Sequence, residues 1–373
     1  MAPSAFLFWS CIGLVGWTYA GYPAWAGHRA RRRGTTPSIG SGTPPVTVII
    51  AAHDEAHRIE ARIRDVLDQD YPPERLEVLL VDDGSEDGTS LRAQGIDPRV
   101  RILTLPGQVG KAAALNAAVA SGTRDILVFA DARQRYAPGA LRALVAAFAD
   151  PSVGAVSGEL AIDDSGRVAI GLYWRMEKAL RAAEARLGWL HGVSGANHAM
   201  RRELFVAMPR GLVLDDLWLP LHVRFAGRRV WMARGAIACD QASAGASEEF
   251  HRKLRTLAGN WQLLACLPRV ANPRTNPVFA AWLSHKFLRL VAPWALLLAL
   301  AASARLAGRP FYRLAFLLQT IAWLAAAFAL ARPRAARHVP LLPAAGTFLA
   351  LNAAALLALP ALLFGPRRLW RRH

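Results

Sequence analysis

Acidic residues are missing from both ends of this 373-residue chain. All 27 Asp and Glu residues lie between Asp54 and Glu249. Residues 28–33 contain four Arg, and residues 278–373 contain twelve cations, in both cases without an acid. The segment between them, 34–277, has 29 cations against 27 acids and is nearly neutral. The net charge of +18 therefore belongs to the ends of the chain, and it argues against a central domain that binds nucleic acid.

Cysteine is scarce as well. Cys11, Cys239 and Cys266 are far apart and form no CxxC or Cys/His spacing, which excludes the usual zinc sites and indicates isolated thiols in a reducing compartment. A P-loop is also absent. Only two residues separate Gly107 from Gly110-Lys111, where that motif needs four, and no Ser or Thr follows Lys111. No internal repeat occurs at the periods typical of solenoids.

An uncharged apolar run occupies the N-terminal end. Residues 4–26 are long enough to cross a hydrocarbon core of about 30 Å as a helix. The Arg-rich segment 28–33 follows this run, whereas a cleaved signal peptide carries its positive charge before the apolar part. We therefore expect an uncleaved anchor, with residue 34 onward in the cytoplasm according to the positive-inside rule.

The C-terminal end contains three more apolar stretches. Residues 314–331 and 339–365 are expected to span the membrane. Residues 290–304 are uncharged for only 15 positions, so they either span with Arg289 reaching the interface or lie within the interface. We expect an integral protein of a bacterial inner or plasma membrane.

The number of C-terminal spans stays open at the level of sequence. Three spans would place the arginines at 367–372 outside, against the charge rule. Two spans would place them inside but would leave the arginines at 332–337 outside. The side of the C-terminus is therefore undecided.

The middle of the chain alternates strand-like and helix-like segments. We expect buried strands at 46–51, 76–81, 100–105 and 126–130, with helices between about 55 and 67 and over 111–120. This alternation predicts an α/β fold with a doubly wound, mostly parallel sheet, which binds ligands at the carboxyl ends of its strands. The expected division is an anchor with its basic flank (1–33), a linker (34–45), an α/β domain (46–277) and a membrane region with two or three spans (278–373).

Acidic side chains follow three of the expected strands. The first strand ends in His53-Asp54-Glu55, the second in Asp82-Asp83 and the fourth in Asp131. Each acid taken alone is explained as a helix cap or a turn residue. Three strand ends that carry acids in sequence order instead favour a ligand site at one edge of the sheet.

A series of short motifs runs through this central segment. They are AHDE at 52–55, VDDGSEDGT at 81–89, GK at 110–111, LN at 115–116, Asp131, GAN at 195–197, RR at 201–202 and LDD at 214–216. In this order they resemble inverting family 2 glycosyltransferases, which have the GT-A fold. The resemblance covers about residues 46–262, and the membrane-flanked layout is similar to that of hyaluronan, cellulose and poly-N-acetylglucosamine synthases.

The resemblance implies roles for individual residues. Ala52, Glu55 and Asp83 would surround the base and ribose of a nucleotide sugar, Lys111 and Arg255 would bind its diphosphate, Asp131 would hold Mg²⁺ or Mn²⁺, and Asp216 beside Asp215 would be the general base. A carboxylate that accepts a hydrogen bond from a uracil imide favours UDP-sugars over purine donors. Direct attack on the anomeric carbon, assisted by one base, would invert the anomeric centre.

Two departures from the family pattern bear on the chemistry. The metal motif reads Asp131-Ala132-Arg133, so its second acid is replaced by an Arg that could take over part of the metal's charge. The QxxRW element of processive synthases is replaced by RKLRT at 252–256, in which Arg255 could still bind diphosphate. Trp261 could line the acceptor site or anchor the chain at the membrane interface. Long-chain processivity is therefore in doubt.

The sequence favours a membrane-bound enzyme that moves a sugar from a nucleotide diphosphate to a polysaccharide or a lipid. The expected partners are a UDP-sugar, a glycan or lipid acceptor and the bilayer, without nucleic acid. One alternative is transfer to a polyprenyl phosphate, whose anionic oxygen needs no base. The other is a catalytically inactive membrane scaffold that keeps the GT-A fold. An amphipathic helix over 171–188 is expected to pack on the core.

Overall fold

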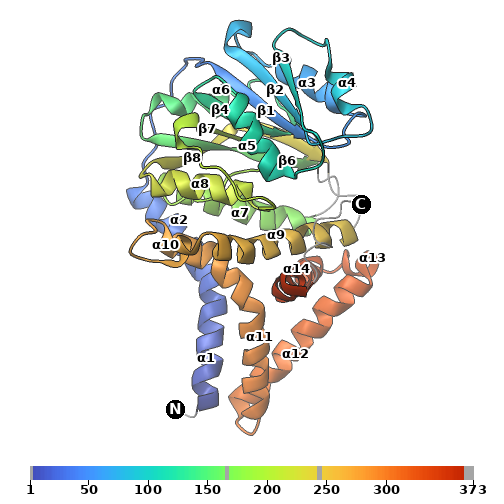
Figure 1. The fold of residues 1–373 in the computed structure, drawn as a ribbon. Helices are drawn as coiled ribbons and strands as arrows, with labels where there is room; N and C mark the ends of the chain where they lie inside the picture. The colour runs from blue at the N-terminus through green and yellow to red at the C-terminus, as the bar shows by residue number, and fades with distance from the viewer. Residues whose placement is uncertain (1–2, 164–167, 242–245, 365–373) are drawn as a thin grey trace.

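The computed structural model describes residues 3–163, 168–241 and 246–364. In this part of the chain a mixed α/β domain lies above a group of long helices (Figure 1). The domain is built on an eight-stranded sheet of order β3-β2-β1-β4-β7-β6-β8-β5. Its strands are β1 (Val46–Ala52), β2 (Leu76–Asp82), β3 (Val100–Thr104), β4 (Ile126–Asp131), β5 (Arg135–Tyr136), β6 (Val153–Asp163), β7 (Asn197–Arg201) and β8 (Arg229–Gln241).

The half of the sheet that begins at β3 confirms the predicted strands. β2 and β3, β1 and β2, and β1 and β4 pair in parallel. β1 and β2 are buried almost throughout, as their β-branched and aliphatic runs predict for strands covered on both faces. The other half is mixed, because β7 runs antiparallel to both β4 and β6. The sheet is therefore parallel where the acid-bearing strands end.

Helices cover both faces of the sheet. Alternate side chains of β1 enter two separate cores: Ile49 joins the core with α5 (Lys111–Ser121) and α8 (Asp215–Phe225), whereas Val48 and Ile50 join the core with α3 (Ile59–Leu67) and α6 (Ala140–Val145). Figure 1 shows these layers. The remaining helices of the domain are α4 (Thr89–Ala93), α7 (Val168–Arg186) and α9 (Ala246–Cys266), with 3₁₀ turns at Pro73–Arg75, Ala146–Ala149, Arg202–Leu204 and Pro268–Ala271. The doubly wound layering predicted from the sequence is confirmed.

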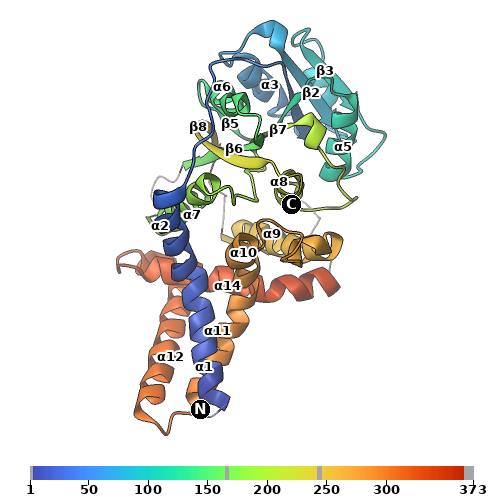
Figure 2. The ribbon, with the colours of Figure 1, turned by 90° about the vertical axis from the view of Figure 1, so that its left-hand side faces the viewer.

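A helical stalk extends away from the domain (Figures 1 and 2). It comprises α1 (Pro3–Gly16), a π-helical turn at Trp17–Gly21, α2 (Tyr22–Arg33), α10 (Phe279–Trp282), the π-helical turn η6 (Leu283–Phe287), α11 (Leu288–Arg305), α12 (Pro310–Ala331), α13 (Pro333–Ala336) and α14 (Leu342–Phe364). Phe279–Arg305, Pro310–Ala331 and Leu342–Phe364 are long and apolar enough to be candidate membrane spans. Residues 4–26 are helical as predicted. Within this region α1 packs against α11 and α2 contacts α7, while the role of 4–26 as an anchor stays a prediction.

The structure bears on the C-terminal stretches in two ways. The helix that includes 290–304 begins at Phe279, and Arg289 lies inside it and pairs with Glu177 of α7 at 2.9 Å. α11 runs away from the domain and α12 returns, so Arg332 lies at the end near the domain. α14 lies across these helices, seen end-on in Figure 1 and lengthwise in Figure 2, and it contacts α9.

Candidate active site

The parallel strands bring predicted site residues to one edge of the sheet. Ala52 at the end of β1 is paired in register with Asp82 of β2, and Ala51 with Asp131 of β4. The backbone N–H of Asp83 donates to the carbonyl of Ala52 at 2.9 Å. The carboxyl ends of β1, β2 and β4 thus hold Ala52, Asp83 and Asp131 side by side, as their positions after the strands predict.

Asp83 organises the loop in front of this edge. Its Oδ1 accepts from the backbone N–H of Val109 at 2.7 Å, and its Oδ2 accepts from that of Gly110 at 2.9 Å. Gly84 has φ +68°, and a Cβ there would lie 2.4 Å from the carbonyl carbon of Gly107. The turn after β2 and the loop before α5 therefore touch through glycine backbone, and the carboxylate of Asp83 fixes that contact.

Lys111 begins α5 and lies between two carboxylates. Its Nζ is 2.9 Å from Asp131 Oδ1 and 3.2 Å from Asp215 Oδ2. Burial alone would lower the pKa of Lys111, but the two carboxylates outweigh it and raise that pKa. Burial likewise would raise the pKa of Asp131, and the ammonium of Lys111 holds it below its ordinary value. Lys111 and Asp131 are therefore both charged at neutral pH.

Asp216 forms no ion pair at contact distance within the described part of the chain. It follows Asp215 in the first turn of α8, and its Oδ1 is buried with no hydrogen-bond partner among the described residues. Burial and the neighbouring charge of Asp215 raise the pKa of Asp216 to about 6. A carboxylate of this kind is poised to accept a proton near neutral pH.

His198 of β7 is a site residue that the sequence reasoning missed. Its ring stacks on Phe129 of β4 with centroids 4.7 Å apart, and its Nδ1 lies 2.9 Å from the carbonyl oxygen of Ser194. Burial lowers its pKa to about 4, so the imidazole is neutral, and the charges of Asp215 and Lys111 act on it. Its position directly after the GAN motif is the signal that could have found it.

The replaced metal-motif residue, Arg133, has a carboxylate of its own. Its Nη2 lies 2.6 Å from Oδ2 of Asp240 on β8, and Gln134 Nε2 donates to the same oxygen at 3.0 Å. The side chain of Asp240 is only 3% exposed. The charge of Arg133 is therefore already compensated within the protein.

The other predicted residues lie around this centre. The backbone N–H of Glu55 donates to Thr89 Oγ1 at 2.9 Å, and its carboxylate pairs with Arg58 at 2.9 Å. Arg255 is an exposed residue of α9, and Figure 1 shows this helix between the domain and the long helices. Trp261 of the same helix packs edge-on against Phe287 of η6, with ring centroids 5.8 Å apart.

The residues present fit a divalent cation only in part. Among the described residues no three His, Cys, Asp or Glu side chains gather as a metal site. The carboxylate of Asp131 is 35% exposed at the sheet edge. Magnesium in nucleotide enzymes is commonly held by one or two carboxylates, with phosphate oxygens and waters completing the shell. Asp131 fits that partial role.

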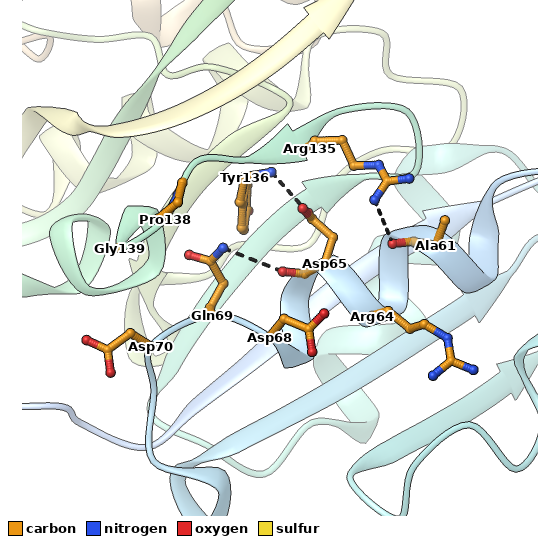
Figure 3. A pocket seen from close by; sticks show the side chains of 10 residues that line it. All are labelled: Ala61, Arg64, Asp65, Asp68, Gln69, Asp70, Arg135, Tyr136, Pro138 and Gly139. Atoms are coloured by element: carbon orange, nitrogen blue, oxygen red, sulfur yellow. Dashed lines mark hydrogen bonds between the residues drawn. The ribbon is translucent and has the colours of Figure 1, made fainter.

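A surface hollow of about 480 Å³ lies at the end of α3, apart from these residues (Figure 3). Its wall includes Asp65, Asp68 and Asp70 from the α3 side and Arg135 from β5. The carboxylate of Asp65 accepts from the backbone N–H of Tyr136 at 3.0 Å. None of the predicted site residues lines this hollow, so we do not assign it to the candidate active site.

Sequence comparisons identify proteins that are similar to this chain. Residues 47–207 match the family model described as glycosyl transferase family 2. An N-acetylglucosaminyltransferase of Sinorhizobium fredii is 33% identical over 165 residues, which is 41% of this chain and 40% of that protein. One of Rhizobium meliloti is 32% identical over 175 residues, 44% of this chain and 41% of that protein. The matched part thus spans about two fifths of the length of these relatives.

A solved structure resembles nearly the whole chain. The mannosyltransferase PcManGT from Pyrobaculum calidifontis, in complex with GDP-Man and Mn²⁺, superimposes with a TM-score of 0.73 at 27% identity, covering 96% of this chain and 99% of that one. The motifs, the mixed sheet and these relatives agree. The chain contains a family 2 glycosyltransferase domain with the GT-A fold.

Proposed function

We propose that this protein transfers a sugar from a nucleotide diphosphate to a polysaccharide or lipid acceptor, with inversion, at the cytoplasmic face of a membrane. The observation that carries the proposal is the environment of Asp216. A buried carboxylate with an unpartnered oxygen and a pKa near 6 lies within electrostatic reach of Lys111, which is paired with Asp131 at the ligand-binding edge of the sheet. That set suits an activated hydroxyl opposite a diphosphate leaving group.

The acceptor step requires a base and no covalent intermediate. Asp216 takes the proton of the acceptor hydroxyl while the acceptor oxygen bonds to the anomeric carbon. The bond between that carbon and the diphosphate oxygen breaks with its electron pair, and the nucleoside diphosphate leaves. One such displacement inverts the anomeric centre. The carboxylate of Asp215, paired with Lys111, supplies the negative charge that helps to raise the pKa of Asp216.

The donor site lies at the carboxyl ends of the first strands. Lys111 would bind the diphosphate, Ala52, Glu55 and Asp83 would surround the nucleoside, and Arg255 would close the site from α9. Because both oxygens of Asp83 accept backbone N–H groups, we propose that it acts on the nucleoside mainly by holding the loop at Val109 and Gly110. The names of the relatives favour N-acetylglucosamine as the sugar, and we propose UDP as its carrier.

We propose a divalent cation, Mg²⁺ or Mn²⁺, held by Asp131. When bound, it would supply positive charge to the departing diphosphate. The likeness to PcManGT, which was solved with Mn²⁺, supports this assignment. The proposed layout is an anchor (1–33), a linker (34–45), the transferase domain (46–277) and a membrane region (278–373).

A donor screen tests the proposal. The full chain in lipid nanodiscs is incubated with Mn²⁺, a membrane lipid extract and, in turn, UDP-N-acetylglucosamine, UDP-glucose and GDP-mannose. We expect release of nucleoside diphosphate from UDP-N-acetylglucosamine above all, a sugar-bearing product by mass spectrometry, and loss of at least 90% of the rate with excess EDTA. Turnover of GDP-mannose alone would overturn the UDP assignment. Turnover of none of the three would favour the inactive scaffold.

A further inference from the structure

A charged seam connects the transferase domain to the first candidate membrane span. Glu177, Arg181 and Glu184 are spaced by four and three residues and therefore share one face of α7. His285, in the π-helical turn η6, lies between the two carboxylates. Its Nδ1 is 2.9 Å from Glu184 Oε1, and its Nε2 is 2.8 Å from Glu177 Oε1. The imidazole ties η6 to α7 at two points.

Both carboxylates of the seam are further occupied by protein groups. Arg289 Nη1 lies 2.9 Å from Glu177 Oε2. The hydroxyl of Tyr22, on α2, donates to Glu184 Oε1 at 2.7 Å, and that contact is buried. Groups from α2, η6 and α11 thus contact the two carboxylates of α7, which have few acceptor positions left for another cation.

Two cations remain without a carboxylate partner in this seam. Arg181 donates to neutral oxygens, Ser157 Oγ at 3.0 Å and the carbonyl of Gly192 at 3.3 Å. Lys286 forms no ion pair with a carboxylate of the described residues. The carboxylates of Glu177 and Asp216 attract the charge of Lys286 without contacting it, whereas Arg181 and Arg289 act unfavourably on it. Arg181, Lys286 and Arg289 thus outnumber Glu177 and Glu184 by one within the seam, and a further carboxylate on which Arg181 and Lys286 both act is that of Asp216.

This excess charge is next to the proposed base. Both Arg181 and Lys286 act electrostatically on Asp216. The segment that accepts from Arg181 at Gly192 continues to Val193, whose N–H donates to the carbonyl of Asp216 at 2.9 Å. Lys111 reaches Asp216 electrostatically from the sheet edge, whereas Lys286 belongs to the candidate span Phe279–Arg305. Asp216 therefore has cations on its donor side and on its membrane side.

We propose that Arg181 and Lys286 bind the phosphate of a lipid-linked acceptor and so bring the acceptor hydroxyl to Asp216. This rests on the proposed function and specifies its acceptor. A guanidinium and an ammonium that repel each other are both stabilised by one phosphate, to which arginine offers a planar fork and lysine a point charge. Lys286 lies four residues before the uncharged run 290–304, the depth at which lipid phosphates meet a membrane helix. The buried indole N–H of Trp261, without a described partner, offers a further donor near Phe287.

Two lipid acceptors, one that carries phosphate and one that does not, test the assignment. One is a polyprenyl diphosphate carrying a single sugar, and the other is an alkyl glycoside of the same sugar. With the full chain in nanodiscs, we expect Lys286→Met to raise KM for the diphosphate acceptor at least tenfold. KM for the alkyl glycoside and for the donor should stay within twofold, and Lys286→Arg should recover most of the loss. Arg305→Met, at the far end of the same span, should change none of these values.

Other outcomes separate the possible errors. An equal loss with both acceptors, or no loss with either, overturns the assignment. A raised KM for the donor identifies the donor diphosphate as the ligand of Lys286. If Lys286→Met does not fold, wild-type inhibition decides: sugar-free polyprenyl phosphate should compete with the acceptor and not with the donor, and competition with the donor overturns the assignment. Absence of any wild-type turnover would instead mean that the proposed function has failed.

Discussion

At the scale of single residues, the site places three carboxylates around one lysine ammonium, which contacts two of them. Asp131 and Asp215 share Lys111, whereas Asp216 is left with a buried, unpartnered oxygen. Its position after a strand predicted Asp131 at the sheet edge, and the family resemblance implied that Lys111, Asp215 and Asp216 belong to the same site. The sharing of one ammonium by Asp131 and Asp215 could not be predicted, because it depends on how α8 is placed against β4 by tertiary packing.

Asp216 should destabilise the folded protein at neutral pH. Its pKa is raised from 3.8 to about 6 on folding, so ionisation favours the unfolded state and stability falls as pH rises between those values. Asp216→Asn removes this cost and should raise the free energy of unfolding at pH 7.5, by up to about 3 kcal/mol. Thermal unfolding at pH 7.5 and pH 4 measures this. A gain of the same size at both pH values would contradict the raised pKa.

At the scale of elements, strands β1 to β4 were predictable because each is a run of aliphatic residues that ends in a polar turn. His198 and Asp240 lie near the site because β7 pairs with β4 and β8 pairs with β5. These strands are far apart in the sequence, and no local sequence pattern predicts their pairing. The helix that holds 290–304 extends beyond its apolar run because Glu177 of α7 compensates Arg289. The sequence pattern could not include a partner on another helix.

The contact between the turn after β2 and the loop before α5 gives a matched pair of variants. Gly84 and Gly88 both have positive φ, but an added Cβ meets backbone at 2.4 Å only at Gly84 and meets nothing within 4 Å at Gly88. Gly88→Ala should cost about 1 kcal/mol of stability, the price of the backbone conformation alone. Gly84→Ala should cost more and should raise the donor KM at least tenfold, because it moves the loop that Asp83 holds. Equal effects of both variants on stability and donor KM would refute this role.

At the scale of the whole molecule, the arrangement of the helices bears on where the arginines at 332–337 lie, which the sequence left open. α11 and α12 form a hairpin directed away from the domain, and α14 lies across the domain-proximal end (Figure 2). Arg332, Arg334 and Arg337 therefore lie on the same side of the hairpin as the domain. This agrees with the positive-inside rule for a domain in the cytoplasm.

Cysteine labelling in intact cells measures that topology. In a background without Cys11, Cys239 and Cys266, a membrane-impermeant maleimide should label Gly308→Cys, between α11 and α12, from outside. It should label Arg334→Cys, in α13, only after the membrane is permeabilised. The reverse pattern would show that the domain is on the other side, and labelling of both positions from outside would show that α12 does not span.

The most direct test of the whole account is the pH dependence of sugar transfer with and without the carboxylate of Asp216. For the wild type, kcat/KM of nucleoside diphosphate release should fall about tenfold for each pH unit below about 6 and stay level above it. Asp216→Asn should be at least 100-fold slower at pH 7.5. Asp70→Asn, an exposed acid paired with Arg142, should match the wild type. Full activity of Asp216→Asn, with the wild-type pH profile retained, would contradict the assignment of Asp216 as the base.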